Sequence, residues 1–131
     1  MRFGPPRGES ATLTITVTPE MTARVGGSEL HPVYGTIALA GHVEEVCRSL
    51  LVPHLEEGEE GVGHAIELTH RAPVPVGMEL TLTATVAEVG PQRLKCEVLA
   101  RQGQRLVARG SFEQRVVDCA DFRAQVEGVP A

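Results

Sequence analysis

A regular alternation of apolar and polar residues begins after the ninth residue of the chain. Over positions 11–18 every second residue is apolar, and the four residues between them are threonines. A period of two, formed largely by β-branched residues, is typical of a strand with one buried face. We therefore expect a strand over 11–18, preceded by a loosely held segment over 1–9 that is rich in Gly and Pro.

The pattern changes to a helical period at Thr36. When residues are projected at about 100° each, the apolar positions fall on one stripe. The stripe consists of Leu39, Val43, Val46 and Leu50, and is extended by Ile37, Ala40, Cys47 and Leu51. Thr36 can cap the start of this helix and Pro53 can end it. We predict an apolar helix over 36–52, and a loop or short broken helix over 19–35, which contains the Gly26-Gly27 pair.

Four further segments return to a period of two after an expected solvated acidic turn at 56–61. They cover 62–72, 78–86, 93–101 and 105–113, and short turns typical of hairpins join the last three. A short helix is expected near 119–126. One apolar helix cannot bury itself, so the sheet must curl around it. The expected fold is therefore α+β, with a five-stranded antiparallel sheet wrapped around one central helix in a single domain over 1–131.

Composition and charge exclude several classes of protein. Lys plus Arg is 12 and Asp plus Glu is 17, which leaves a net charge of −5; nucleic-acid and membrane-surface partners usually need a basic patch. The three cysteines, Cys47, Cys96 and Cys119, are widely spaced and form no Cys-x-x-Cys, so we expect no disulfide framework. No apolar leader or membrane-length run occurs. We expect a soluble cytoplasmic protein that forms a homodimer through an unpaired sheet edge, with a tetramer left open.

Three residues are candidates for chemistry. Glu44 lies at the margin of the apolar stripe, where a carboxylate either has a catalytic role, turns to solvent or pairs with Arg48. His70 shares a strand face with apolar residues and is either a hydrogen-bonded core histidine or a general base. Thr36 opens the helix and is either an N-cap or a hydroxyl beside an anion-binding helix terminus.

Other common catalytic and binding motifs are absent. The chain has no Gly-x-Ser-x-Gly, no phosphate-binding Gly-rich loop and no Gly-x-Gly-x-x-Gly, so a serine hydrolase, a P-loop enzyme and a dinucleotide oxidoreductase are not expected. His64 and His70 are too far apart along one strand for a metal chelate, and no metal or redox cofactor is expected. His31, His42 and His54 are expected in loops or on the surface.

Several segments, taken in order, resemble the fluoroacetyl-CoA thioesterase group, which has the hot-dog fold of a sheet around a central helix. The segments are His31-Pro-Val-Tyr-Gly-Thr36, Glu44 eight residues later, and Gly63-His-Ala-Ile-Glu-Leu-Thr-His70 followed by Ala72-Pro-Val-Pro-Val-Gly77. The resemblance covers roughly residues 13–125. It implies a catalytic set of Thr36, Glu44 and His70, with Gly63 approaching the thioester carbonyl. Leu30, His31 and Pro32 stand where that group has lid phenylalanines, so we expect little preference for a fluorinated acyl group.

The resemblance implies a homodimeric acyl-CoA thioesterase that releases a small acid and CoA without a further cofactor. His70 would take or relay a proton, Glu44 would attack the carbonyl or activate water, and Thr36 would orient these groups. Candidates for binding the CoA phosphates are Arg71, Arg93, Lys95, Arg101 and Arg109. Two alternatives remain open: an enoyl-CoA hydratase of the same fold, and a non-catalytic acyl-CoA-binding module.

Overall fold

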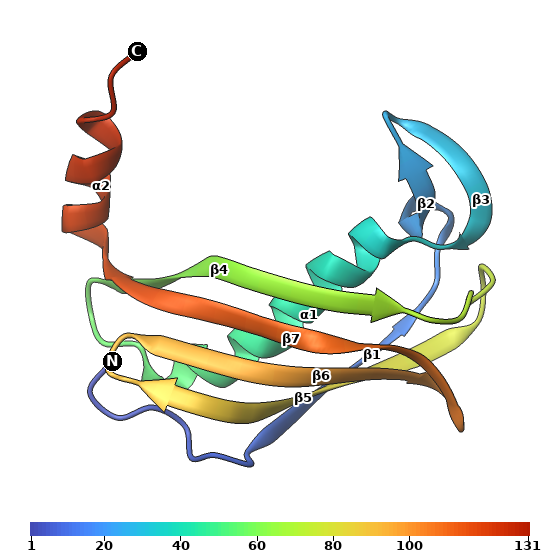
Figure 1. The fold of residues 1–131 in the computed structure, drawn as a ribbon, viewed down its shortest axis with the longest axis horizontal. Helices are drawn as coiled ribbons and strands as arrows, with labels where there is room; N and C mark the ends of the chain where they lie inside the picture. The colour runs from blue at the N-terminus through green and yellow to red at the C-terminus, as the bar shows by residue number, and fades with distance from the viewer.

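The computed structural model describes all residues, 1–131, and contains one large sheet, one small sheet and two α-helices. The large antiparallel sheet has the strand order β1-β5-β6-β7-β4, and β2 pairs with β3 in a separate hairpin (Figure 1). The strands are β1 (Ser10–Thr16), β2 (Thr22–Val25), β3 (Ser28–Tyr34), β4 (Glu59–His70), β5 (Glu79–Gly90), β6 (Arg93–Gln102) and β7 (Arg105–Asp118). The helices are α1 (Thr36–Leu51) and α2 (Cys119–Glu127), with short 3-10 turns at Pro19–Met21 and Val52–His54.

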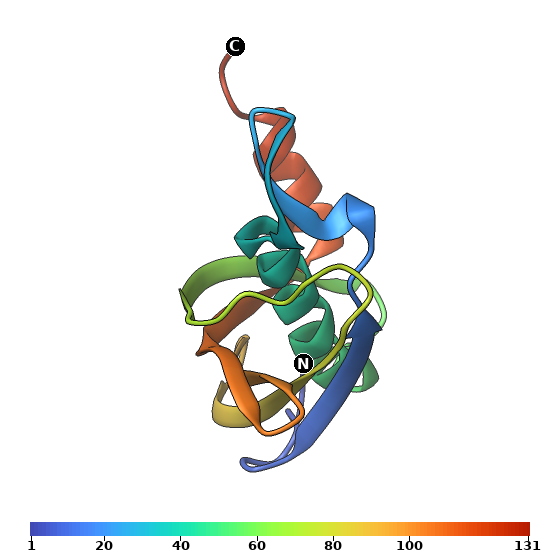
Figure 2. The same cartoon turned by 90° about the vertical axis from the view of Figure 1, so that its right-hand side faces the viewer.

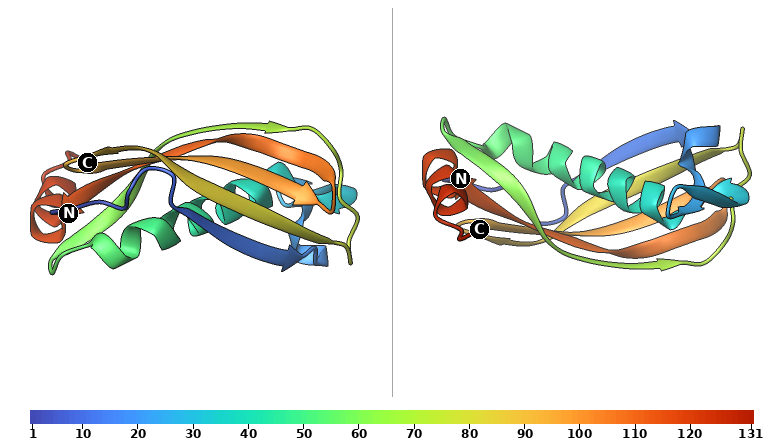
Figure 3. Two further views of the ribbon diagram at one scale, coloured as in Figure 1. Left: turned by 90° about the horizontal axis from the view of Figure 1, so that it is seen from below. Right: turned by 90° about the horizontal axis from the view of Figure 1, so that it is seen from above.

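The large sheet curls around α1, as the view along the helix shows (Figure 2), and α1 lies along the concave side of the sheet (Figure 3). Six residues on one face of α1 are buried: Leu39, Val43, Val46, Cys47, Leu50 and Leu51. They pack with alternating residues of β5 and β6 in a single core. The expected hot-dog arrangement is confirmed, because the amphipathic helix can bury its apolar face only against the inner face of the sheet.

The structure corrects several predicted boundaries. The segment expected to be a loop or broken helix contains the β2–β3 hairpin, whose glycine turn at Gly26 and Gly27 has positive φ values of 60° and 84°. The helix ends at Leu51, one residue before the predicted end. Ile37, which was expected to extend the buried stripe, is 76% exposed, although Leu39 in the same turn is fully buried. Ile37 lies seven residues before the exposed Glu44, on the same margin of the stripe.

The N-terminal segment is packed against the sheet, contrary to the expectation of a loose lead-in. Met1 is buried, the N–H of Gly8 donates to the Val86 carbonyl at 2.9 Å, and the N–H of Val86 donates to the Glu9 carbonyl at 2.8 Å. These hydrogen bonds extend the pairing of β1 with β5. The acidic segment is also more ordered than predicted, because β4 begins at Glu59.

Strand β4 lies at an edge of the sheet and is unusual in its exposure. It pairs on one side with β7, and the residues from Gly63 to Glu67 are all exposed, whereas β5 alternates between buried and exposed residues. The rest of the chain therefore covers neither face of β4 between Gly63 and Glu67. The β2–β3 hairpin and α2 both project beyond this same edge, at opposite ends of the strand (Figure 1).

None of the helices combines the length and apolarity that crossing a membrane requires. No three His, Cys, Asp or Glu side chains gather in an arrangement that could hold a metal ion.

Candidate active site

Thr36 and His70 are brought together at one end of the molecule. The Thr36 hydroxyl oxygen lies 2.9 Å from Nδ1 of His70, so the first residue of α1 contacts the last residue of β4. Gly35, and not Thr36, is the N-cap, and no side chain caps this helix. Of the two roles left open for Thr36, the N-cap is therefore contradicted, and its hydroxyl is directed to the imidazole.

The approach of β3 to α1 depends on Gly35. Its N–H donates to the Met21 carbonyl at 2.8 Å, and its carbonyl accepts from the N–H of Leu39 at 3.0 Å. A Cβ at this position would lie 2.9 Å from Cα of Ala23, closer than such atoms come in proteins. A residue without a side chain is thus required where the helix starts against the backbone of β2.

His70 has the environment expected of a general base. It is half-buried, and removal of solvent lowers the pKa of its imidazole below the usual 6.5, although a backbone hydrogen bond at Ala72 opposes the shift. Its Nε2 is buried and has no hydrogen-bond partner in the chain. Because buried polar atoms normally have a partner, this nitrogen is free for a water molecule, a substrate or another subunit.

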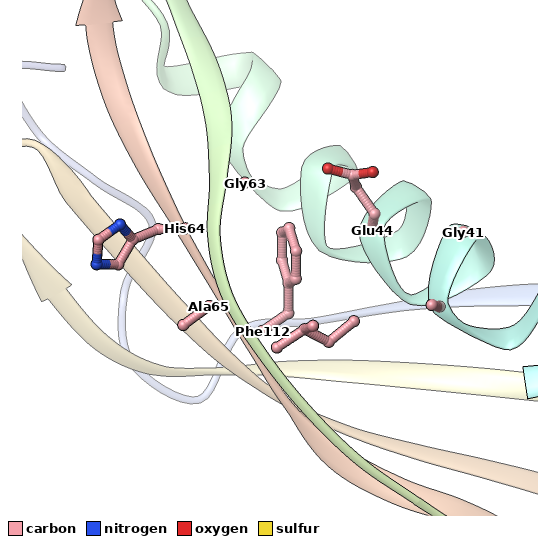
Figure 4. Close-up of a pocket in the computed structure, with 8 residues that line it drawn as sticks. Gly41, Glu44, Gly63, His64, Ala65 and Phe112 are labelled. Carbon is pink, nitrogen blue, oxygen red and sulfur yellow. The ribbon is translucent and has the colours of Figure 1, made fainter. Parts of the chain in front are cut away.

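Glu44 lies farther along α1 and faces Gly63 of β4 (Figure 4). Its Oε2 is 3.1 Å from the position that a Cβ on Gly63 would occupy, so a side chain there would crowd the carboxylate. Gly63 also lies at an irregularity in the pairing of β4 with β7, between Gly63 and Ala65. A bulge of this kind interrupts the ladder of backbone hydrogen bonds and leaves the extra residue unpaired.

The alternative in which Glu44 pairs with Arg48 is not observed. The Arg48 guanidinium donates two hydrogen bonds to Glu60, at 2.6 and 2.9 Å. This bidentate contact, together with the N–H of Gly61, lowers the pKa of Glu60 to about 2. Glu44 is exposed and has no ion-pair partner, so its carboxylate is available for chemistry.

The four candidate residues form two half-sites in one chain. Thr36 and His70 make one, and Glu44 and Gly63 make the other. Eight residues of an α-helix rise about 12 Å, which is the axial separation between Thr36 and Glu44. A direct hydrogen bond between the two half-sites of one chain is therefore out of reach.

A pocket of about 380 Å³ adjoins the Glu44 half-site. Its lining residues are Ala40, Gly41, Glu44, Gly63, His64, Ala65, Ile66 and Phe112. The Phe112 ring stands between α1 and β4, and its Cζ is 3.4 Å from the Cβ position of Gly63, whereas the His64 ring points away from the helix (Figure 4). Small residues on either side of one aromatic ring leave room for a small apolar group beside the carboxylate.

Sequence reasoning missed one pair of residues near the site. His42, expected on the surface, is half-buried, and its Nδ1 lies 2.7 Å from the hydroxyl of Tyr34. The Tyr34 ring in turn lies edge-to-face against the His70 imidazole, with centroids 6.1 Å apart. The helical projection placed His42 among polar residues, and nothing in the pattern indicated a partner at the end of β3.

Comparisons with known proteins agree on one family. A sequence model of the family described as fluoroacetyl-CoA-specific thioesterase matches residues 17–120. The fluoroacetyl-CoA thioesterase of Streptantibioticus cattleyicolor is 33% identical over an alignment of 132 positions, which covers 96% of this chain and 95% of the relative. A solved structure of the fluoroacetyl-CoA thioesterase FlK is similar with a TM-score of 0.88 and 31% identity, covering 98% of this chain and 100% of that chain.

Other structures support the same relationship. A thioesterase-superfamily member from Thermus thermophilus gives a TM-score of 0.87 with 33% identity, covering 93% of this chain and 90% of that chain. Structures of FlK variants contain acetyl-CoA in one case, and fluoroacetate with CoA in another.

Proposed function

We propose that this chain, which belongs to the family of fluoroacetyl-CoA-specific thioesterases, hydrolyses a small acyl-CoA to the free acid and CoA. The expectation of a thioester hydrolase is confirmed by this membership, and the choice of acyl group is the proposal. The single observation that carries it is the pocket beside Glu44, because a volume of about 380 Å³ lined by Phe112 and small residues has room for a short acyl chain.

The residues at the site support a reaction through a carboxylate and an imidazole. A neutral His70 accepts a proton at Nε2, the atom that has no partner in the chain. Glu44 either attacks the thioester carbonyl or activates the attacking water, and both routes are consistent with an exposed, unpaired carboxylate. The Thr36 hydroxyl holds Nδ1 of His70, and backbone N–H groups at Gly63 stabilise the developing oxyanion.

We further propose that the two half-sites are joined across a dimer formed along β4. The strand is an edge exposed from Gly63 to Glu67, and unpaired edges are normally covered. A two-fold axis near the middle of this strand would place the Glu44 half-site of one subunit against the Thr36–His70 half-site of its partner. The projecting hairpin and α2 would then embrace the partner, and each dimer would hold two complete sites.

Ion pairs within the chain reduce the number of basic side chains that are available to bind the CoA phosphates. Arg93 is paired with Glu113 and Glu88 at 3.0 and 3.3 Å, and Lys95 lies 3.6 Å from Glu88. Arg71, Arg101 and Arg109 form no ion pair in the chain, so these three are the better partners for the CoA phosphates. Of these, Arg71 directly follows His70 in the sequence.

The substrate is tested with a panel of acyl-CoA thioesters and detection of the free thiol. We expect turnover of acetyl-, propionyl- and fluoroacetyl-CoA at similar kcat/KM and little turnover of long chains. Hydration of crotonyl-CoA without thiol release would instead indicate a hydratase. CoA binding with no turnover of any thioester would indicate a binding module.

The joined site is tested by mixing two inactive variants, Glu44→Gln and His70→Ala, after dissociation and reassociation. If the half-sites meet across the interface, each mixed dimer regains one intact site. Random equimolar mixing should then restore about a quarter of wild-type sites. If both residues act within one chain, every site carries a substitution and no activity returns. Light scattering on the same samples checks that the subunits are dimeric.

A further inference from the structure

Tyr34 is a fully buried phenol placed between two imidazoles. It is 1% exposed, and it is the last residue of β3, directly before the Gly35–Thr36 start of the helix. Its hydroxyl lies 2.7 Å from Nδ1 of His42, and the two rings are nearly parallel with an interplanar angle of 11°. On its other side the ring meets His70 edge-to-face at an angle of 71°.

The protons of this pair are fixed by burial. Loss of solvent raises the pKa of Tyr34 and lowers the pKa of His42, so the phenol keeps its proton and the imidazole stays neutral. With both groups neutral, the hydroxyl donates to Nδ1 when the His42 ring proton is on Nε2, and accepts from Nδ1 in the other tautomer.

A polar pair is not needed to fill this part of the core. Two apolar side chains of similar volume would pack there without the desolvation of a phenol and an imidazole. The hydrogen-bonded pair instead gives the Tyr34 ring one fixed orientation, whereas apolar packing would tolerate several orientations.

His70 requires such a fixed neighbour. Its bond to Thr36 holds Nδ1, but a single hydrogen bond leaves the imidazole plane free to tilt about that contact. The Tyr34 ring limits this tilt, since their centroid separation of 6.1 Å lies within the preferred range for edge-to-face aromatic pairs. Nε2 then keeps one direction, toward the place where it would accept a proton.

We propose that Tyr34 and His42 act together as positioning residues for His70: the Tyr34 ring fixes the imidazole plane, and His42 fixes the Tyr34 ring. This inference rests on the proposed role of His70 in thioester hydrolysis. Neither residue touches the reacting atoms, so their effect is on the placement of the base.

The test compares kcat and KM for the best acyl-CoA in wild type, His42→Leu, Tyr34→Phe and the double variant, with thermal melts. His42→Leu leaves the phenol buried without a partner, and we expect kcat to fall about tenfold with KM nearly unchanged, since misplacement by about 1 Å can cost about 10²-fold. The double variant removes the unpaired buried phenol but also lacks the hydrogen bond that orients the ring, so its melting temperature should recover while kcat stays about tenfold low. His54→Leu, far from the pair in sequence and without a side-chain hydrogen bond, is the matched control.

The outcomes separate the two proposals. Loss of thermal stability in His42→Leu with kcat unchanged would overturn the positioning role and leave a structural one. Recovery of the wild-type kcat in the double variant, which lacks the hydrogen bond, would also overturn it. A wild-type protein that turns over no thioester would instead reject the proposed function. Nitrogen NMR of wild type needs no variant: a neutral His42 ring with a hydrogen-bonded Nδ1 is expected, and an Nδ1 that forms no hydrogen bond would contradict the contact on which the inference depends.

Discussion

The hydroxyl oxygen of Thr36 lies 2.9 Å from Nδ1 of His70, although the two residues are 34 positions apart in the sequence. The contact is possible because Gly35 takes the N-cap position and because β4 ends beside the start of α1. A threonine at a helix start would ordinarily be assigned to capping. Here its side chain forms a hydrogen bond with a histidine instead, and substitutions can distinguish this role from capping.

Substitution of Thr36 separates the two roles. Thr36→Val removes the hydroxyl and keeps the shape, so we expect kcat/KM to fall about 10- to 100-fold, by loss of a hydrogen bond that orients a catalytic group. Thr36→Ser should retain most of the activity. Because the hydroxyl makes no cap bond, the melting temperature should change little in either variant. A large loss of stability in Thr36→Val would point to a capping role instead.

Glu44 and His70 should behave as one working unit. Glu44→Gln keeps the shape and removes the charge, and loss of an acid–base or nucleophilic group typically costs about 10²–10⁴-fold in rate. His70→Ala should cost a comparable factor, and the double variant should be little worse than either single one. Glu45→Gln, one residue away and also exposed, is the matched control. Full activity in Glu44→Gln would reject the assignment, provided Glu45→Gln is active as well.

The pH dependence follows from the burial of His70. Because its pKa lies below 6.5, a base at this position is neutral at pH 7 and becomes protonated only in more acidic solution. The acid limb of kcat/KM should therefore have a midpoint below 6.5. The folded protein also binds this proton less readily than the unfolded chain, so stability should decrease as pH falls below about 6.5. A limb centred above 6.5 would contradict the assignment of His70 as the base.

Phe112 should set the length of the acyl chain. Phe112→Ala removes the ring that stands between α1 and β4 in the pocket. The ratio of hexanoyl-CoA to acetyl-CoA turnover should then rise at least about tenfold, since each methylene is worth about 1–3 kcal/mol in an apolar pocket. The substitution costs about 3–5 kcal/mol of stability, so Phe112→Leu provides a milder variant. Leu94→Ala, at a buried residue of β6, is the control and should leave the ratio unchanged.

The ion pair of Arg48 and Glu60 gives a separate prediction for stability. Both side chains are nearly half exposed, so solvent screening limits the contribution to about 1 kcal/mol. The pKa of Glu60 is depressed from 4.5 to about 2, so this contribution is complete above pH 4.5 and is lost as pH falls toward 2. The difference in unfolding free energy between wild type and Glu60→Gln should shrink over that range. A difference that is constant with pH would exclude the ion pair as its source.

Most of the large sheet and the central helix could be predicted from periodicity. The strand periods matched because β1, β5, β6 and β7 each have one face toward the core around α1, whereas β4 is exposed on both faces from Gly63 to Glu67. The hairpin over β2 and β3 was not predicted, because its residues are largely exposed and lie outside the large sheet, so no buried face imposes an alternation. Ile37 was misplaced because a helical projection assumes that the whole stripe meets the core.

The site was less accessible to sequence reasoning than the fold. Spacing indicated Glu44 at the edge of an apolar stripe, but it could not show that Arg48 is held by Glu60 or that Gly63 lies beside the carboxylate. The contact between Thr36 and His70 depends on where β4 ends relative to α1, which no local pattern contains. The Tyr34–His42 pair joins the end of β3 to a face of α1, and no sequence pattern links these two residues.

In the sequence Gly35 lies between Tyr34 and Thr36, the two residues whose side chains contact His70. The backbone of β2 leaves no room for a Cβ at this position, so any replacement would shift both neighbours at once. Gly35, which has no functional group, should therefore be as intolerant of substitution as Glu44 and His70, the proposed catalytic residues. In a library of random variants, selection for activity would deplete position 35 as strongly as positions 44 and 70.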